Sequence, residues 1–260
     1  AHGSLDTQSH DRNHDGFRDL PKTNQINIAN KWLWQSLGGT QIRWGWKYVD
    51  ENRLGGQTEY KKSMREEMEQ SLSTYGSHMD NTGVNAYFKL GTPVGAAVYD
   101  SETEEEYRSN IAFVADYNYF KEDAYFGLND YNGHDHAWWF NFMYAHYFSP
   151  RSSLIVGASA SITNSDEKIL NNVVLADKER WSGMTRNKMN YVEPGVFAEY
   201  TYTLPEKFSF VLGLRGDWMG AKNIDRAYVT GNGEYNNSNT AYYTPKERFV
   251  LTPRTHIRWD

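Results

Sequence analysis

The 260-residue chain has a formal net charge of −6 and no cysteine. The negative charge argues against a nucleic-acid partner, because phosphate binding needs a basic surface. The lack of cysteine excludes disulfides, thiolate metal ligands and cysteine nucleophiles. Mean hydropathy is low, at −0.78, yet 15% of the residues are aromatic, with 19 Tyr and 9 Trp. A membrane β-barrel reconciles these facts, because its lipid-facing side is aromatic and apolar while its interior and outer loops are wet.

The N-terminus shows no secretion signal, since Ala1–Ser4 is followed by polar residues. No run of about 18 apolar residues occurs, which excludes a transmembrane helix. If the protein is exported, we expect its N-terminal segment to be missing from this chain.

Alternation of apolar and polar residues is the dominant pattern, and it predicts β-strands. Trp44 and Trp46, for example, alternate with Arg43 and Lys47. The pattern recurs in about nine segments of roughly 9–13 residues, the length that a tilted membrane-crossing strand needs. These segments are 25–35, 41–51, 84–90, 110–119, 138–144, 153–162, 196–202, 208–217 and 249–259.

The apolar residues of these segments define one predicted outer face. Many are aromatic and lie near strand ends, which is typical of the aromatic girdles at lipid interfaces. A slip of one residue in any strand would turn its set inward. The predicted outer set includes Trp32, Trp34, Trp44, Trp46, Phe113, Tyr117, Trp138, Phe140, Phe208, Phe210 and Leu212.

The connections are predicted to alternate between short turns and long loops, as in bacterial outer-membrane barrels. Short turns rich in Gly, Pro and Ser are expected at 36–40, 149–152 and 204–207, and long polar loops at 52–82, 121–136, 163–188 and 219–248. Within the first long loop, Met64–Leu72 contains good helix formers and predicts a short helix. The 90–109 connection should be short but is not, so we predict an elongated turn with strand extensions.

A soluble β-sandwich or β-propeller also produces alternation. A sandwich buries its apolar face in branched aliphatic residues, whereas the sets here are rich in Trp, Tyr and Phe. The pattern therefore favours a membrane barrel over a soluble sheet.

Several sequence segments carry a more specific signal. The first is HDRNHDGFRDLP (10–21), followed by QINIANKW (25–32). The others, in chain order, are YFGLNDYNG (125–133), EPGVFAEYTY (193–202), GLRGD (213–217) and TPRTHIRW (252–259). Together they resemble the barrel region of Bacteroidetes-type TonB-dependent receptors, and the resemblance covers nearly the whole chain.

That resemblance implies an all-β antiparallel meander that forms part of an outer-membrane barrel, with about nine of some 22 strands. It also implies active import of a scarce nutrient or its chelate: siderophore-bound iron, haem, cobalamin or a glycan. The implied partners are outer-membrane lipid, the receptor's own plug domain and the TonB complex. Residues 1–260 contain no plug, TonB box or closing C-terminal strand, so we expect a fragment that cannot transport alone.

The most specific local motif is Asp11-x-Asn13-x-Asp15-Gly16-x-x-Asp19. Oxygens at alternate positions and a Gly at the sixth allow a tight loop to wrap a hard cation such as Ca²⁺. We predict a structural calcium ion bound by Asp11, Asn13, Asp15 and Asp19 together with a backbone carbonyl near residue 17. The alternative is a solvated turn, which Asp and Asn also favour.

No motif indicates an enzyme: the chain has no Gly-x-Ser-x-Gly, no His-Glu-x-x-His and no phosphate-binding glycine loop. Glu193 and Glu199 share a face by parity, but on a membrane strand they are more simply polar groups of the lumen. His134-Asp135-His136 lacks the spacing of a metal site. Charged residues opposite the apolar set, such as Arg215, are expected to pair with one another or with a plug.

Two other function classes remain open. A passive porin would show the same alternation without a plug, and a soluble carbohydrate-binding β-protein would use its aromatics as sugar platforms. Solubility without detergent separates the soluble protein from both barrels. A plug and a TonB box upstream of the chain would separate a receptor from a porin.

Overall fold

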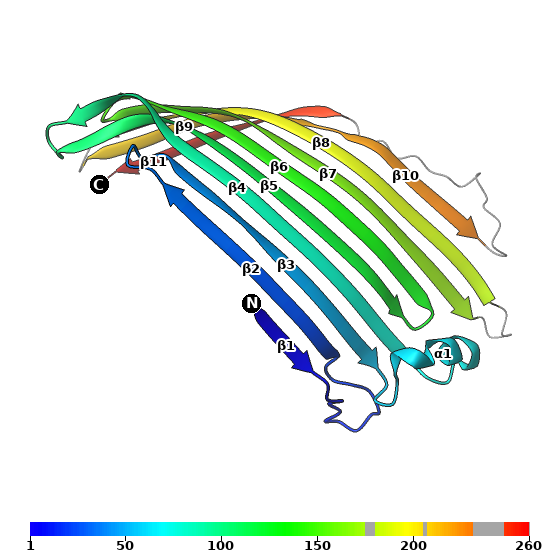
Figure 1. Ribbon diagram of the computed structural model, residues 1–260. Helices are drawn as coiled ribbons and strands as arrows, with labels where there is room; N and C mark the ends of the chain where they lie inside the picture. The colour runs from blue at the N-terminus through cyan, green and yellow to red at the C-terminus, as the bar shows by residue number, and fades with distance from the viewer. Residues whose placement is uncertain (175–179, 205–206, 231–246, 260) are drawn as a thin grey trace.

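The computed structural model describes residues 1–174, 180–204, 207–230 and 247–259. They form one antiparallel sheet of eleven strands with one short helix (Figure 1). The strands pair in the order β1 to β9 followed by β11, while β10 pairs with β8. The predicted antiparallel meander is therefore confirmed. The sheet curves, and its edge strands β1 and β11 do not pair with each other, so it is open.

The strands are much longer than the alternating segments from which they were predicted. Each of β4 to β8 contains between 21 and 25 residues. Their bounds are β1 His2–Asp6, β2 Lys22–Gln35, β3 Gln41–Gly56, β4 Gly76–Asp100, β5 Glu105–Phe126, β6 Asn129–Ser149, β7 Ser152–Val174, β8 Arg180–Leu204, β9 Phe208–Met219, β10 Ala221–Thr230 and β11 Arg248–Trp259.

β9 and β10 are two parts of one strand path. β9 pairs with residues 195–204 of β8, and β10 continues along residues 183–191 of the same strand. The interruption falls at Gly220. β11 then pairs with β9 over its full length, so the connectivity remains that of a meander.

The short turns predicted at 36–40 and 149–152 are present, and the middle of the third, residues 205–206, lies outside the described residues. Two of the predicted long loops are wrong. Residues 121–136 form the β5–β6 hairpin with only Gly127 and Leu128 between the strands, and β7 and β8 leave only 175–179 between them. Gly127 has φ +57°, which suits the first position of a tight hairpin turn. These strand extensions were not predicted because their side chains are polar on both faces and show no alternation. Their backbone hydrogen bonds form regardless of hydropathy.

The other two predicted loops are only partly loops. β3 and β4 extend into the first, leaving 57–75, which contains the 3₁₀ turn η1 (Lys62–Met64) and helix α1 (Arg65–Ser71). The helix expected at 64–72 is therefore confirmed. The predicted loop at 219–248 contains β10, and its remaining part, 231–246, lies outside the described residues. β1, which has no alternating pattern, was not predicted.

The 90–109 connection is an extended hairpin, as expected. β4 runs to Asp100 and β5 starts at Glu105, with a shift of register between Pro93 and Ala97. The hairpin projects beyond the neighbouring turns (Figure 1). Arg151 in the β6–β7 turn pairs with Glu102 at its tip at 2.7 Å, which ties these two turns together.

The described residues contain very little hydrophobic core. Only Tyr60, Met68, Ala124 and Tyr125 are buried hydrophobic residues. The chain exposes 16858 Å², whereas a globular monomer of this mass exposes about 12,000 Å². The sheet is thus a single layer along most of its length. Helix α1 has seven residues, and no helix among the described residues is long and apolar enough to cross a bilayer.

Candidate functional site

One face of the sheet carries a continuous set of apolar side chains, which we call the apolar face. Directly paired residues on neighbouring strands share a face, and the register joins Trp32 to Trp44, Trp44 to Phe88, and Tyr117 to Trp138. The same register places all eleven residues of the predicted outer set on this face. None of them is buried. The prediction that these residues share one face of the sheet is therefore confirmed.

The apolar side chains of this face form a stretch that crosses the sheet, which we call the apolar belt, and on β7 polar residues bound it on both sides. On β7 it runs from Leu154 to Ile162, about 26 Å along the strand. A strand tilt of about 40° reduces this to a height of roughly 20 Å, close to the lipid-facing band of known membrane barrels. Trp32 and Trp44 stack at 5.7 Å within the belt, and Tyr117 packs on Trp138 at 4.1 Å.

The belt shifts along the strands from one side of the sheet to the other. The row of paired residues that begins at Ile26 on β2 passes through Asp50 and Thr82 and reaches Asp166 on β7. The apolar stretch therefore lies nearer the short turns on β7 than on β2. Strands that are tilted to a flat lipid layer require such a shift.

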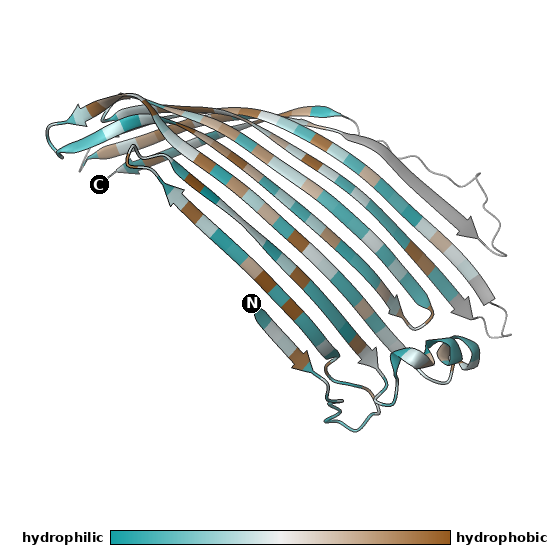
Figure 2. Ribbon diagram, viewed as in Figure 1, coloured by the Kyte–Doolittle hydropathy of each residue, from teal (hydrophilic) through white to brown (hydrophobic). Residues whose placement is uncertain are grey.

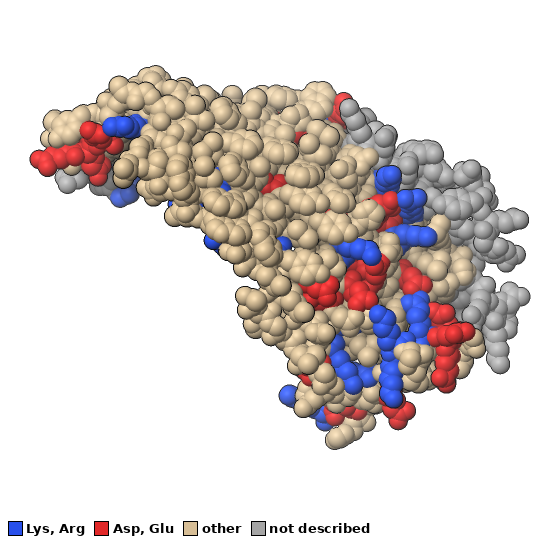
Figure 3. All heavy atoms as spheres, viewed as in Figure 1, with Lys and Arg blue, Asp and Glu red and all other residues tan. Residues whose placement is uncertain are grey.

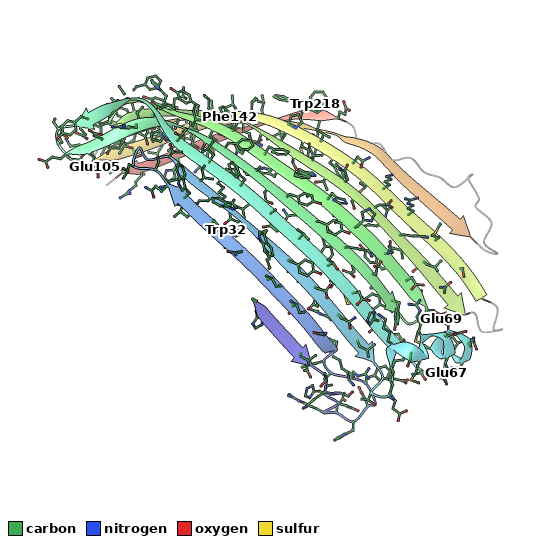
Figure 4. The ribbon with its side chains drawn as sticks, viewed as in Figure 1. Trp32, Glu67, Glu69, Glu105, Phe142 and Trp218 are labelled. Carbon is green, nitrogen blue, oxygen red and sulfur yellow. The ribbon has the colours of Figure 1, made fainter. Side chains whose placement is uncertain are left out.

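Charged residues flank the belt. Figure 3 shows acidic and basic side chains gathered near α1 and at the tip of the β4–β5 hairpin, with few charges between. Figure 2 shows the same change as hydrophilic strand ends beside α1. In Figure 4, Trp32, Phe142 and Trp218 lie along the sheet between Glu105 at the hairpin and Glu69 on α1. The apolar face therefore gives way to charged side chains beside α1 and at the tip of the β4–β5 hairpin.

The opposite face, which we call the polar face, carries ion pairs at the level of the belt. Arg215 binds both oxygens of Asp217 at 2.7 and 2.8 Å and donates to the Ser159 hydroxyl at 2.8 Å. Arg254 donates to Glu199 at 3.1 Å. The expectation that charges on this face pair with one another is confirmed for these residues.

Two adjacent hollows on the polar face, of about 310 and 420 Å³, share Arg215 and Thr252 in their walls. Glu193 and the half-exposed Trp139 line the larger one, and Arg254 lines the smaller. Glu193 and Glu199 lie on the same face by register, as parity predicted. Both hollows are wide open and lined by acidic and basic side chains, as expected of a surface in contact with water.

The predicted calcium motif forms a compact loop before β2. The carboxylate of Asp11 accepts the backbone N–H groups of Asp15 and Gly16 at 3.2 and 3.0 Å. Asn13 donates to Asp15 at 2.9 Å, and Asp19 accepts the backbone N–H of the residue after Asp11 at 2.8 Å. Gly16 has φ +87°, so the sharp turn predicted at this glycine is present. All four predicted side chains thus belong to one hydrogen-bonded turn.

The attachment of this loop to the sheet was not predicted from the sequence. The guanidinium of Arg18 donates to the backbone carbonyls of Gly55, Thr58 and Tyr60 at 3.3, 2.8 and 2.8 Å, and to the Ser9 hydroxyl at 3.1 Å. Burial lowers the pKa of Arg18 from its ordinary value. The loop is therefore fixed to the end of β3 and to the segment that leads into α1.

Helix α1 packs against the apolar face beyond the belt. Tyr60 and Met68 are almost fully buried, and the Tyr60 hydroxyl lies 2.7 Å from that of Tyr125 on β5. A side chain at Gly76 would come within 2.1 Å of the Tyr60 ring, so only glycine fits there. Burial is the main cause that raises the pKa of Tyr125, and the contact with Tyr60 adds to it.

Polar contacts complete this cluster. Arg65 stands 4.0 Å above the Tyr125 ring and pairs with Glu69 at 2.8 Å and Asp130 at 2.5 Å. His78 stacks on Tyr125 at 5.7 Å, and burial lowers the pKa of His78. Sequence analysis missed this cluster, because its members are brought together only by the β4–β5 register.

The His134-Asp135-His136 segment does not form a chelate. His134 and His136 lie on the apolar face, with ring centroids 5.9 Å apart, whereas Asp135 pairs with Phe120 and so lies on the polar face. Within the described ranges, no three or more His, Asp or Glu side chains are grouped to hold a metal ion. A comparison with known protein families and with curated protein sequences finds no match to this chain.

Proposed function

We propose that this chain forms part of the wall of an outer-membrane β-barrel in a TonB-dependent active transporter. The observation that carries the proposal is the apolar belt, which extends from β2 to β9 and which no described element covers. Trp32, Trp34, Trp44 and Trp46 are 38–50% exposed. They alone present about 400 Å² of aromatic surface, as much as the largest apolar patch on many soluble monomers.

Lipid is the partner that best explains this surface. A soluble sandwich would cover the apolar face with a second sheet about 10 Å away, and the described strands form one layer only. The height of the belt, its shift across tilted strands and its aromatic content all support a bilayer as the covering solvent. The polar face, with its ion pairs and open hollows, would then line the lumen.

The choice of an importer rests on the sequence segments that resemble TonB-dependent receptors. Such a protein would hold a plug domain in the lumen and draw energy from the TonB complex. Its cargo would be a scarce nutrient or its chelate, within the range of siderophore-bound iron, haem, cobalamin and glycans. A passive porin has the same kind of wall, but the resembling segments favour the importer.

Cell fractionation combined with uptake assays tests the proposal. The full-length protein should appear in the outer membrane and dissolve only with detergent. Uptake of one of the four nutrients should depend both on this protein and on TonB. Recovery in the aqueous fraction would exclude a membrane barrel, and uptake that continues without TonB would indicate a passive porin.

Ca²⁺ is the structural ion that we propose for the loop of Asp11, Asn13, Asp15 and Asp19. Three carboxylates within nine residues repel one another, and a cation that accepts oxygen ligands at about 2.3–2.6 Å removes that repulsion. The tight turn at Gly16 supports this assignment, as does the clamp by Arg18. The ion would hold the loop at the outer end of the sheet and take no part in chemistry.

A further inference from the structure

Four basic side chains gather on the polar face of β2, β3 and β4, at the level of the apolar belt. Arg43 on β3 is directly paired with Lys89 on β4. Lys31 on β2 is directly paired with Gly45, and the same-face neighbours of Gly45 along β3 are Arg43 and Lys47. The register therefore brings together four cations from three adjacent strands, and all four are exposed. We call Lys31, Arg43, Lys47 and Lys89 the basic quartet.

The basic quartet lacks negative partners. Among the described residues, none of its four members forms an ion pair. Apart from the Arg43–Lys89 pair, their direct cross-strand partners are uncharged: Ala29, Leu33, Gly45, Asn85 and Val114. Within the described strands, the one carboxylate diagonal to a quartet member is Asp116 on β5. It already accepts hydrogen bonds from two Asn side chains, so four positive charges face one negative charge.

The register makes this excess charge unfavourable. Like charges in a direct pair, such as Arg43 and Lys89, destabilise a sheet. The next carboxylate on this face of β3 is Glu51, four residues from Lys47, and it pairs with Arg53 at 2.7 Å. The two arginines that line the hollows described above, by contrast, each have a carboxylate partner. The quartet is therefore a basic surface that an added anion would balance.

An aromatic ring lies in the middle of the basic quartet. Tyr87 on β4 is directly paired with Gly45, and a Cβ atom at Gly45 would lie 2.9 Å from the Tyr87 ring. The ring therefore leans over the glycine, between the four cations. The ammonium of Lys89 lies 5.8 Å from the ring centroid. The surface thus offers apolar contact to a ring or hydrocarbon group and positive charge to the anionic groups attached to it.

The dimensions of the basic quartet favour a small molecule. Four residues separate Arg43 from Lys47, about 13 Å along the strand, and β2 to β4 span about 10 Å across the sheet. A stable protein interface covers about 800 Å² on each partner and is depleted in Lys, whereas three of the four cations here are Lys. A small molecule with several anionic groups matches this area better than the surface of a plug domain.

We propose that the basic quartet binds an anionic cargo, a small molecule that carries two or more carboxylate or phosphate groups, as the cargo moves along the wall of the lumen. This inference rests on the proposed function and names the chemical class of the transported nutrient. An oxyanion between Arg43 and Lys89 removes their repulsion, and the guanidinium can hold two of its oxygens. Anionic iron chelates and haem, which carries two carboxylates, fit this surface, whereas a neutral glycan does not.

Isothermal titration calorimetry of the full-length protein in neutral detergent tests the proposal, with trimesate, a benzene ring that carries three carboxylates, as the probe. The wild type should bind trimesate, and its affinity should fall as the salt concentration rises. Lys47→Gln/Lys89→Gln should bind it about tenfold more weakly, since an exposed charge pair contributes up to about fivefold. The matched control is Lys168→Gln/Lys188→Gln, which makes the same charge change on the apolar face and should leave binding unchanged. A heat-dependent shift in gel mobility verifies that both variants form folded barrels.

The absence of trimesate binding by the wild type would overturn the proposal and leave an acidic plug surface as the partner of the quartet. Equal affinity of the wild type and the quartet variant would also overturn it, and so would an equal loss in the control. Equally tight binding of the uncharged triamide of trimesate would show that charge does not select the ligand. Failure of the proposed function is distinguishable, because fractionation locates the wild type without any probe.

Discussion

Arginine substitutions at Ala160 and Ser161 test directly which face of the sheet meets lipid. The two residues are adjacent on β7, similar in size, and lie on opposite faces. Ala160 is paired with Phe140 and Pro194 near the middle of the belt, whereas Ser161 is paired with Trp139 and Glu193 on the polar face.

We expect Ala160→Arg to lower the free energy of unfolding in a lipid bilayer by about 2–4 kcal/mol, the cost of a lipid-facing Arg near the midplane of a barrel. Ser161→Arg gains a carboxylate neighbour in Glu193 and should change stability by less than about 1 kcal/mol. The difference corresponds to roughly a thirtyfold to thousandfold change in the folding equilibrium. Denaturant titration of the full-length protein in vesicles measures it.

The same substitution outside the belt separates lipid from a protein cover. Asn164 lies on the same face and strand, just beyond Ile162, where an Arg would reach the interface and should cost no more than about 1 kcal/mol. The reasoning would be refuted if Ala160→Arg changed stability by less than about 0.5 kcal/mol, as on a water-exposed surface. It would also be refuted if Ser161→Arg were the more damaging change.

Three further predictions concern the outer end of the sheet. Asp15→Ala should abolish the protection from proteolysis that calcium gives the 11–19 loop, whereas the control Arg12→Ala should retain that protection. If the wild-type loop were protected equally without calcium, the proposed Ca²⁺ site would be refuted. Arg18→Ala removes three hydrogen bonds to backbone carbonyls and should lower the free energy of local opening of this loop, measured by hydrogen exchange, by about 3 kcal/mol. If the decrease were no larger than that caused by Arg12→Ala, Arg18 would not be what holds the loop to the sheet. Because burial lowers the pKa of folded His78, the unfolded state binds the proton more readily, so protection of the α1 cluster should be lost as the pH falls below about 6.5. His78→Gln should remove that dependence, and an unchanged profile in this variant would assign it to another group.

The strands could be predicted from the sequence only where their two faces differ in polarity. Within the belt, one face carries apolar side chains and the other carries polar ones, so Trp44 and Arg43 alternate visibly. Beyond the belt, both faces are polar. The 121–126 and 129–136 segments therefore look like a loop, although their backbones continue β5 and β6 to a turn of two residues.

The candidate sites divide in the same way. The tight turn of the 11–19 loop was predictable, because its side-chain oxygens and its glycine lie within nine residues. The Arg18 clamp was not, because its acceptors are backbone carbonyls 37–42 residues away, and a carbonyl leaves no signature in a sequence.

This division between predictable and unpredictable features has a physical cause. In a single-layer sheet, the polarity of most side chains depends on the face they occupy and not on a packed neighbour. The resulting pattern can therefore be recognised within the sequence of one strand. The α1 cluster is the exception, since Tyr60 needs the glycine at 76 and the hydroxyl of Tyr125 on distant strands.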